Sequence, residues 1–257
     1  MIRKPLLGAS ALLLAAAALA QAPSHPPSLT VDEIVAKNLK ARGGVDKLKA
    51  VSSVRMSGRM TLGPGQEAPL VIELKRPSKV RIEVTVQGMT MIQAYDGATG
   101  WAVVPFAGKP DPQAMGPEET RQAEEQADFD GPLMDWKQKG HKVELVGKEK
   151  VPEGEAYKLR VTLKGGDVRY FFVDASSFLE VRAEGKRTAQ GSEMEFENIL
   201  KDYRAVGGLM VAHAVEMGPK GAAEKAKLTL DKVELNPAID EGRFKMPAAK
   251  PAEAPKQ

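Results

Sequence analysis

The three histidines are the side chains of this sequence best suited to proton transfer or metal binding, and their spacing does not favour a shared site. His25 lies in a proline-rich stretch, His141 opens an alternating segment, and His213 shares an apolar face with Leu209 and Val215. Histidines this far apart provide no ligand spacing for zinc. We interpret His213 as a buried core residue, and we predict no metal and no cofactor.

The stretch Asp128-Phe129-Asp130-Gly131 places two carboxylates close together, as a calcium loop does. A calcium-binding EF-hand loop needs further oxygen ligands at alternate positions and a closing glutamate, and the sequence lacks them. We therefore interpret Asp130 as the cap of a helix that begins near Pro132.

Catalytic signatures are missing from the sequence. It contains no G-x-S-x-G, P-loop or H-E-x-x-H motif and no cysteine. None of its acidic residues stands in an apolar context that would shift its pKa. We predict no catalytic residues and a protein that is not an enzyme, with an enzyme acting on an envelope lipid as a remaining alternative.

The segment YDGATGW, from Tyr95 to Trp101, sets an acidic residue and two glycines between two aromatics. Asp96 and Gly97 are typical of a tight turn between two strands. No second acidic cluster accompanies Asp96, so we interpret the segment as a hairpin that places Tyr95 and Trp101 at one rim of an apolar interior.

Methionines are concentrated in the first alternating segments, and methionine is common on adaptable apolar binding surfaces. Ordinary core filling is the alternative. Because aromatic residues make up only 5% of the chain, its interior must be largely aliphatic, which suits acyl chains. The predicted lining of an apolar cavity is Met56, Met60, Ile72, Val84, Met89, Met91, Tyr95, Trp101, Phe106, Trp136 and Phe172.

These side chains must be positioned by a sheet. Thr30 and Glu33 form a capping box that begins a helix, and Gly43-Gly44 ends it. We expect a short turn at 45–51 to lead from this helix into the sheet. Residues 105–140 are expected to form a proline-rich break with two short helical patterns, at 118–129 and 132–140. Apolar and polar residues alternate with the period of a half-buried strand in 54–62, 69–75, 79–86, 89–95, 100–106, 141–148, 156–164, 167–174, 178–186, 194–204, 208–217 and 227–236.

Because the helices are inserted and do not alternate with the strands, the pattern predicts an α+β fold that is mainly β. We expect one large curved antiparallel sheet with helices on its concave face.

The N-terminus has the form of a secretory signal peptide. Arg3 and Lys4 precede the apolar run at 6–20, which is too short to span a bilayer, and Ala18-Leu19-Ala20 fits a cleavage site. We predict a signal peptide at 1–20, a proline-rich linker at 21–29, one domain at 30–247 and a polar tail at 248–257. With no cysteine to carry a lipid, the mature protein is expected to be a soluble, non-lipidated periplasmic monomer.

The charge balance argues against nucleic acid as a partner. Residues 1–20 hold two of the 37 basic residues, so 35 basic residues face 34 acidic ones in the rest of the chain. These charges are interspersed, whereas a nucleic-acid surface needs a basic stripe.

Four segments in order resemble the LolA-like family of periplasmic lipoprotein carriers and outer membrane lipoprotein-sorting proteins. They are ARGGVDKLKAVSSVRMSGRM (Ala41–Met60), LKRPSKVR (Leu74–Arg81), YDGATGWAVVPF (Tyr95–Phe106) and VELNPAIDEGRFKMP (Val233–Pro247). With the matching strand order, the resemblance covers most of residues 30–247.

The resemblance implies an unclosed β-barrel whose apolar concave side is covered by helices acting as a lid. It also implies that the protein shelters acyl chains of lipoproteins or other lipids between transport partners at the inner and outer membranes. The arginine that holds the lid closed in such carriers corresponds to Arg76. Its several fixed donors suit the bridging of backbone carbonyls. This chain is longer than a typical carrier and its middle segment is more charged, so the resemblance does not identify the cargo.

Two further functions remain open on the same fold. One is a sensor or regulatory module that binds the extracytoplasmic domain of a signalling protein. The other is a structural role in an envelope complex.

Overall fold

The computed structural model describes residues 29–63, 65–152, 154–189 and 192–248. The predicted signal peptide and nearly all of the predicted linker and tail lie outside these residues. In the described part of the chain, no helix is both long enough and apolar enough to cross a membrane.

The first helix begins and ends where its sequence dictates. The Thr30 hydroxyl accepts a hydrogen bond from the backbone N–H of Glu33, and the Glu33 carboxylate accepts one from the backbone N–H of Thr30. The helix ends before Gly43, whose φ of 125° is a conformation that side chains with a Cβ rarely adopt. The helices are α1 (Val31–Ala41), α2 (Val45–Ala50) and α3 (Pro117–Ala127), with 3₁₀ turns η1 (Pro105–Ala107) and η2 (Glu241–Arg243).

All strands belong to one antiparallel sheet. The order is β6-β5-β4-β3-β2-β1-β13-β12-β11-β10-β9-β8-β7, so the first and last strands of the domain pair at its centre. The strands are β1 (Ser53–Gly63), β2 (Gln66–Lys75), β3 (Lys79–Val86), β4 (Met89–Tyr95), β5 (Gly100–Val104), β6 (Lys109–Ala114), β7 (Lys142–Val151), β8 (Gly154–Thr162), β9 (Val168–Asp174), β10 (Glu180–Ala189), β11 (Ser192–Val206), β12 (Leu209–Pro219) and β13 (Ala226–Leu235).

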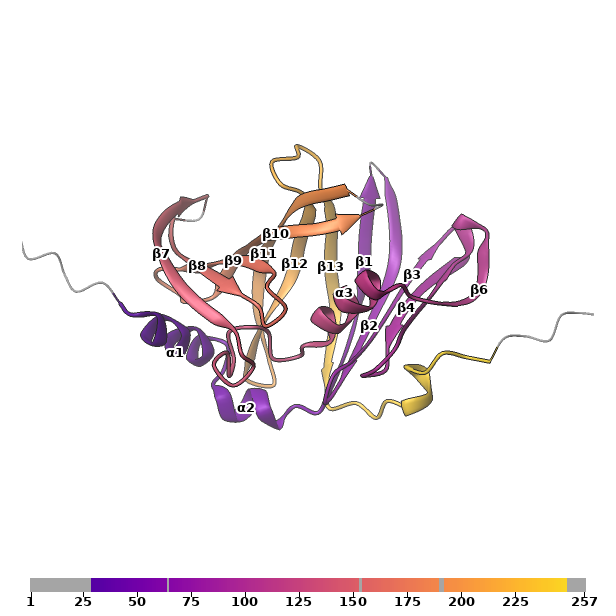
Figure 1. The fold of residues 1–257 in the computed structure, drawn as a ribbon, viewed down its shortest axis with the longest axis horizontal. Helices are drawn as coiled ribbons and strands as arrows, with labels where there is room; N and C mark the ends of the chain where they lie inside the picture. Colours follow the sequence, from indigo (N-terminus) through magenta and orange to yellow (C-terminus); the bar gives the residue numbers. More distant parts are fainter. Residues whose placement is uncertain (1–28, 64, 153, 190–191, 249–257) are drawn as a thin grey trace, which may run out of the picture.

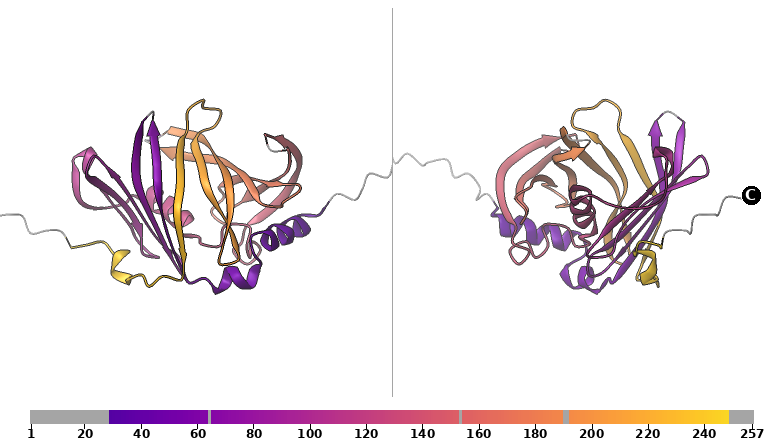
Figure 2. Two further views of the ribbon diagram at one scale, coloured as in Figure 1. Left: turned by 180° about the vertical axis from the view of Figure 1, so that it is seen from behind. Right: turned by 45° about the vertical axis from the view of Figure 1, so that its right-hand side comes forward.

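The sheet curves into a trough that does not close, because β6 and β7 form its two edges (Figure 1). Helix α3 lies inside the curve, between the two arms of the sheet, while α1 and α2 lie at one end of the trough (Figure 2). The predicted curved antiparallel sheet, an unclosed barrel with a few helices on its concave side, is confirmed.

Three local predictions are wrong. Residues 45–50 form the short helix α2, whereas we expected a turn, and residues 109–114 form β6, whereas we expected an irregular break. Residues 132–140 form a series of turns and not the helix that we expected near Pro132.

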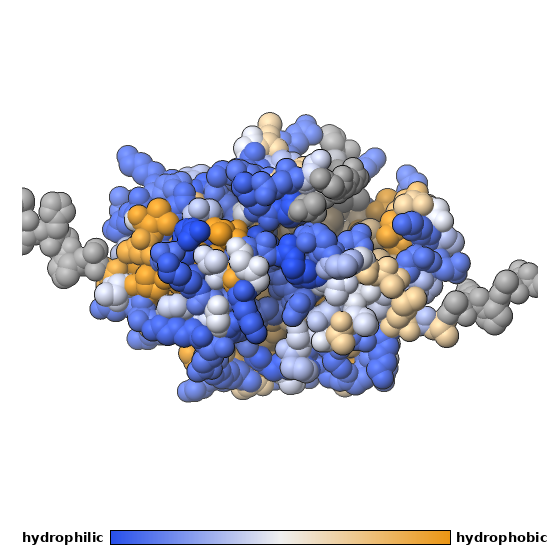
Figure 3. Space-filling view, viewed as in Figure 1, coloured by the Kyte–Doolittle hydropathy of each residue, from blue (hydrophilic) through white to orange (hydrophobic). Residues whose placement is uncertain are grey.

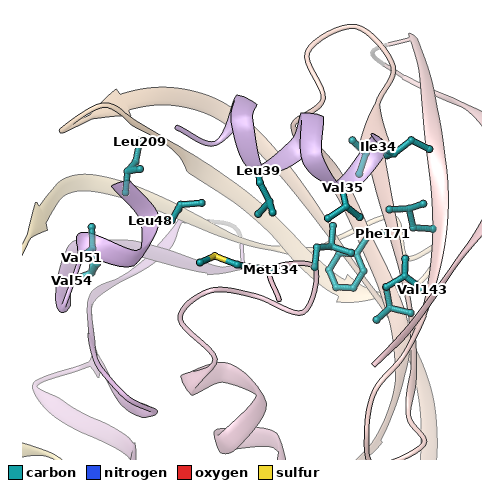
Figure 4. Packing of buried hydrophobic residues seen from close by; sticks show 14 residues of the cluster. Ile34, Val35, Leu39, Leu48, Val51, Val54, Met134, Val143, Phe171 and Leu209 are labelled. Carbon is teal, nitrogen blue, oxygen red and sulfur yellow. The ribbon is translucent and has the colours of Figure 1, made fainter. Parts of the chain in front are cut away.

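The largest core cluster lies between the sheet and the helices α1 and α2. Ile34 and Val35 point from α1 toward Val143 and Phe171 of the sheet, and Leu39 points toward Met134 (Figure 4). Leu48 and Val51 pack beside Val54 and Leu209, and Met134 fills the space between the two groups. These helices are therefore held by ordinary apolar packing.

Candidate functional site

The strand register places apolar side chains from six strands on one face of the sheet. Met56 pairs with Ile72, and Leu70 pairs with Val84, which in turn pairs with Met91. Directly opposed residues of antiparallel strands share a face. We call the resulting cluster the central apolar face. Its buried members are Ala68, Leu70, Val84, Leu228 and Leu230, and its half-buried members are Met56, Met60, Ile72, Ile82, Val86, Met91, Val215, Met217 and Val233.

The central apolar face lies on the concave side of the sheet. Val80 and Tyr95 lie on that same face of β3 and β4, and both pack against Ala123 and Ala127 of α3. Five predicted lining residues meet in the central apolar face. They are Met56, Met60, Ile72, Val84 and Met91.

Four other predicted residues lie outside the central apolar face. Tyr95 is 5% exposed and is covered by α3, and Trp136 packs against the core beneath α1 and α2. Met89 is 40% exposed at the start of β4, and Phe106 is 46% exposed in η1 beside the edge of the sheet.

Trp101 and Phe172 lie on the opposite, convex face, so their assignment to the apolar lining is wrong. Trp101 pairs with Ala94, whereas Tyr95 pairs with Gly100, and neighbouring residues of a strand point to opposite faces. The Trp101 indole N–H donates to the backbone oxygen of Phe244 at 2.7 Å. Phe172 lies beneath the Arg182 guanidinium, 3.8 Å from the ring centroid.

Several members of the central apolar face were missed by the sequence prediction, among them Val86, Val215 and Met217. The apolar–polar alternation within each strand shows that these residues share a face with other apolar residues of the same strand. It does not show which strands are neighbours in the sheet, so the sequence could not bring them into one cluster.

Two hollows lie beside α3, with volumes of about 40 and about 80 Å³, and polar area predominates in both. Pockets for drug-sized ligands measure roughly 300–1,000 Å³, so neither hollow holds an acyl chain. Around α3 the surface is polar, and an apolar area shows beside it over β2 and β3 (Figure 3). Helix α3 covers the part of the concave surface formed by Val80 and Tyr95.

The covering segment is α3 with the turns that follow it, residues 117–140, which we call the lid segment. Arg76, at the end of β2, joins this segment to α2. Its guanidinium donates to the backbone oxygens of Val51 at 2.7 Å and Leu48 at 3.1 Å. It also donates to both carboxylate oxygens of Asp130, at 2.8 and 2.6 Å, and lies 4.7 Å from the centroid of the Phe129 ring.

Asp130 is therefore a partner of Arg76 and not a helix cap, which corrects the sequence interpretation. The hydrogen bonds from the Arg76 guanidinium lower the pKa of Asp130, in spite of the partial burial that raises it. The same hydrogen bonds raise the pKa of Arg76. We call this contact, together with the two carbonyls, the first latch.

His141 and His213 occupy ordinary structural positions. His213 is buried, with its Nδ1 2.9 Å from the backbone oxygen of Val211, which confirms its interpretation as a core residue. The His141 Nδ1 accepts from the backbone N–H of Lys164 at 3.1 Å. His25 lies outside the described residues. In the part of the chain that the structure describes, no three His, Asp or Glu side chains form a group suited to holding a metal.

A single open antiparallel sheet with a helical covering on its concave side defines a LolA-like fold, and comparison with solved structures agrees. A LolA superfamily protein from Nitrosomonas europaea superimposes with a TM-score of 0.55 and 13% identity, over 85% of this chain and 98% of that chain. A structure described as an outer membrane lipoprotein-sorting protein domain, from Vibrio parahaemolyticus, gives 0.54 and 13%, over 82% of this chain and 94% of that one.

A DUF1329 family protein from Desulfovibrio piger gives a TM-score of 0.57 and 11% identity, over 84% of this chain and 97% of that chain. No family model and no curated protein matches the sequence. At these identities the likeness establishes the fold. The protein has a LolA-like fold.

Proposed function

We propose that this protein is a periplasmic carrier that shelters the acyl chains of a lipoprotein or another lipid on the central apolar face, beneath the lid segment. The observation that carries the proposal is the central apolar face itself. It spans six strands of the concave surface, and nine of its side chains are only half-buried. Apolar side chains that stay half-buried on a concave surface give an acyl chain a surface to bind, and movement of the neighbouring α3 would widen access to it.

The energetics suit reversible binding of an acyl chain. Each methylene removed from water contributes about 0.8 kcal/mol, so ten methylenes contribute roughly 8 kcal/mol before the cost of displacing the lid segment. Met56, Met60, Met91 and Met217 supply flexible side chains that adjust to chains of different shape. The site has few polar groups to select a headgroup, which fits a carrier better than an enzyme.

The first latch provides the control that a carrier needs. Arg76 holds the lid segment to α2 through hydrogen bonds and an ion pair, which are contacts that can break and reform in water. In the proposed cycle the latch opens for loading, closes over the acyl chain and opens again for release. The donor and acceptor would be transport partners at the inner and outer membranes, and the carrier would act as a monomer.

Location in the periplasm rests on the apolar run at residues 6–20, which has the form of a signal peptide. A structure described as an outer membrane lipoprotein-sorting protein domain shares this fold, and a role at the cell envelope is compatible with that location.

Two measurements test the proposal. Protein purified from the cell envelope should carry lipid adducts by native mass spectrometry, and delipidated protein should increase the fluorescence of a dansyl-labelled fatty acid. Absence of adducts together with no fluorescence increase would contradict a carrier function.

A further inference from the structure

Helix α3 has two chemically different sides. One faces the arm of the sheet that contains β3 and β4, and the other faces the arm that contains β8 and β9. Ala123 and Ala127 are buried against Val80 and Tyr95. Arg121 and Glu125 lie two positions before these alanines, and two helical positions correspond to roughly 200° around the axis. The charged pair therefore lies on nearly the opposite side of α3 from the alanines.

The charged side reaches the arm of the sheet that lies far from β3 and β4. Arg169 of β9 donates to both carboxylate oxygens of Glu125, at 2.8 and 2.7 Å. Arg121 forms an ion pair with Asp167, in the turn between β8 and β9. In the strand order, β9 lies at the opposite end of the sheet from β4, so α3 joins two arms that do not otherwise touch each other through strand pairing.

Arg169 is held in place for this contact. Its side chain is only 6% exposed, and its Nη1 donates to the backbone oxygens of Val168 at 3.2 Å and Lys186 at 3.0 Å. A Cβ on Gly185 would lie 2.6 Å from the Cδ of Arg169, so the glycine leaves the space that the arginine fills. An arginine fixed by two carbonyls presents its remaining donors to Glu125 with little loss of side-chain freedom.

We propose that Arg169–Glu125 and Arg121–Asp167 form a second latch, which closes α3 across the mouth of the trough separately from Arg76. When this latch opens, α3 turns on its alanine side and remains attached to β3 and β4, because that contact is apolar. The second latch itself is inferred from the contacts of α3. Its role, which is to control access of an acyl chain to the central apolar face, rests on the proposed function.

A distance measurement tests the latch without any ligand. The chain contains no cysteine, so Glu124→Cys on α3 and Lys164→Cys in the turn between β8 and β9 accept spin labels at two sites only. Pulsed electron resonance then reports the separation of α3 from the β8–β9 arm. In Arg169→Met we expect a longer distance component whose population rises roughly tenfold, since charge-assisted hydrogen bonds are lost.

Glu125→Gln is a second variant that keeps the contacts of Arg169 to the two carbonyls, and it should give a smaller shift in the same direction. Arg160→Met is the matched control, because Arg160 forms a comparable ion pair with Glu144 on the convex side, at 2.8 Å. The double variant with Arg76→Leu should add the two effects if the latches are separate.

An unchanged distance distribution in both Arg169→Met and Glu125→Gln would overturn the second latch, and so would an equal shift in Arg160→Met. Fluorescent fatty-acid binding is measured on the same variants. If α3 opens as expected and no fatty acid binds, the latch stands and the proposed carrier function fails.

Discussion

Replacing Arg76 by leucine removes every polar contact of the first latch while keeping an apolar side chain beside Phe129. The lost contacts are the hydrogen bonds to Val51 and Leu48 and the pair of hydrogen bonds to Asp130. We expect the lid segment and the end of α2 to separate more often, with the sheet unchanged.

The magnitude follows from the geometry. Hydrogen bonds to a charged group contribute about 1.5–3 kcal/mol each, and solvent screening reduces this where the partners are exposed. The side chains of Arg76 and Asp130 are 27% and 17% exposed, so screening is partial. Contributions within one network do not add in full, and a total near 3 kcal/mol is a reasonable expectation. This corresponds to a roughly 100-fold increase in the ratio of open to closed lid.

Amide hydrogen exchange measures that ratio directly, since exchange of protected amides follows the population of the open form. Amides in α2 and in residues 128–136 should exchange roughly 100-fold faster in Arg76→Leu. Arg204→Leu is the control, because Arg204 makes a two-point ion pair within its own strand, with Asp202, and neither residue belongs to the lid segment or to α2.

Unchanged exchange in these two segments would refute the latch. Equal acceleration throughout β8 and β9 would also refute it, because Arg76 would then support the whole fold and not the lid.

Three further predictions concern Asp130, Met91 and Trp101. Arg76 lowers the pKa of Asp130 below its ordinary 3.8, so the stabilisation from this carboxylate is complete above pH 3.8 and is lost as the pH falls through the lowered pKa. The population of the open lid, measured as the pH is lowered, should show this transition in the native protein and not in Asp130→Asn. Met91→Glu should weaken binding of a dansyl-labelled fatty acid by roughly tenfold or more, because an unpaired carboxylate on an apolar surface is costly to bury, whereas Thr90→Glu on the convex side of the same strand should not. Trp101→Phe should lower the free energy of unfolding, measured in urea, by about 1–3 kcal/mol, because the Phe244 carbonyl loses its buried hydrogen-bond donor. Fatty-acid binding should stay unchanged; weaker binding would show that Trp101 contacts the ligand after all.

The alternation of apolar and polar residues was enough to predict most of the sheet. It failed at β6 because Pro110 and Pro112 argue against a strand. The strand forms all the same, since it lies at the edge of the sheet and edge strands tolerate proline. The alternation also failed at α2 because six residues are too few for a helical period to emerge. The capping box of Thr30, in contrast, is a local pattern and was predicted correctly.

The site was only partly predictable, for a related reason. Five of the predicted lining residues lie in one apolar cluster because each follows the period of its own strand. Trp101 was placed with Tyr95 because the two end the same hairpin, but Tyr95 pairs with Gly100, and the next residue, Trp101, points to the other face. Asp130 lies 54 residues from Arg76, and no local pattern reveals an ion pair over that separation.

The central claim is that acyl chains lie on the central apolar face, and the methionine methyl groups test it most directly. With the methionine methyls labelled for NMR, a spin-labelled fatty acid should broaden the signals of Met56, Met60, Met91 and Met217. The signals of Met134, buried beneath α1 and α2, and of exposed Met246 should stay sharp. Broadening of Met246 alone, or of no methionine at saturating fatty acid, would contradict the claim.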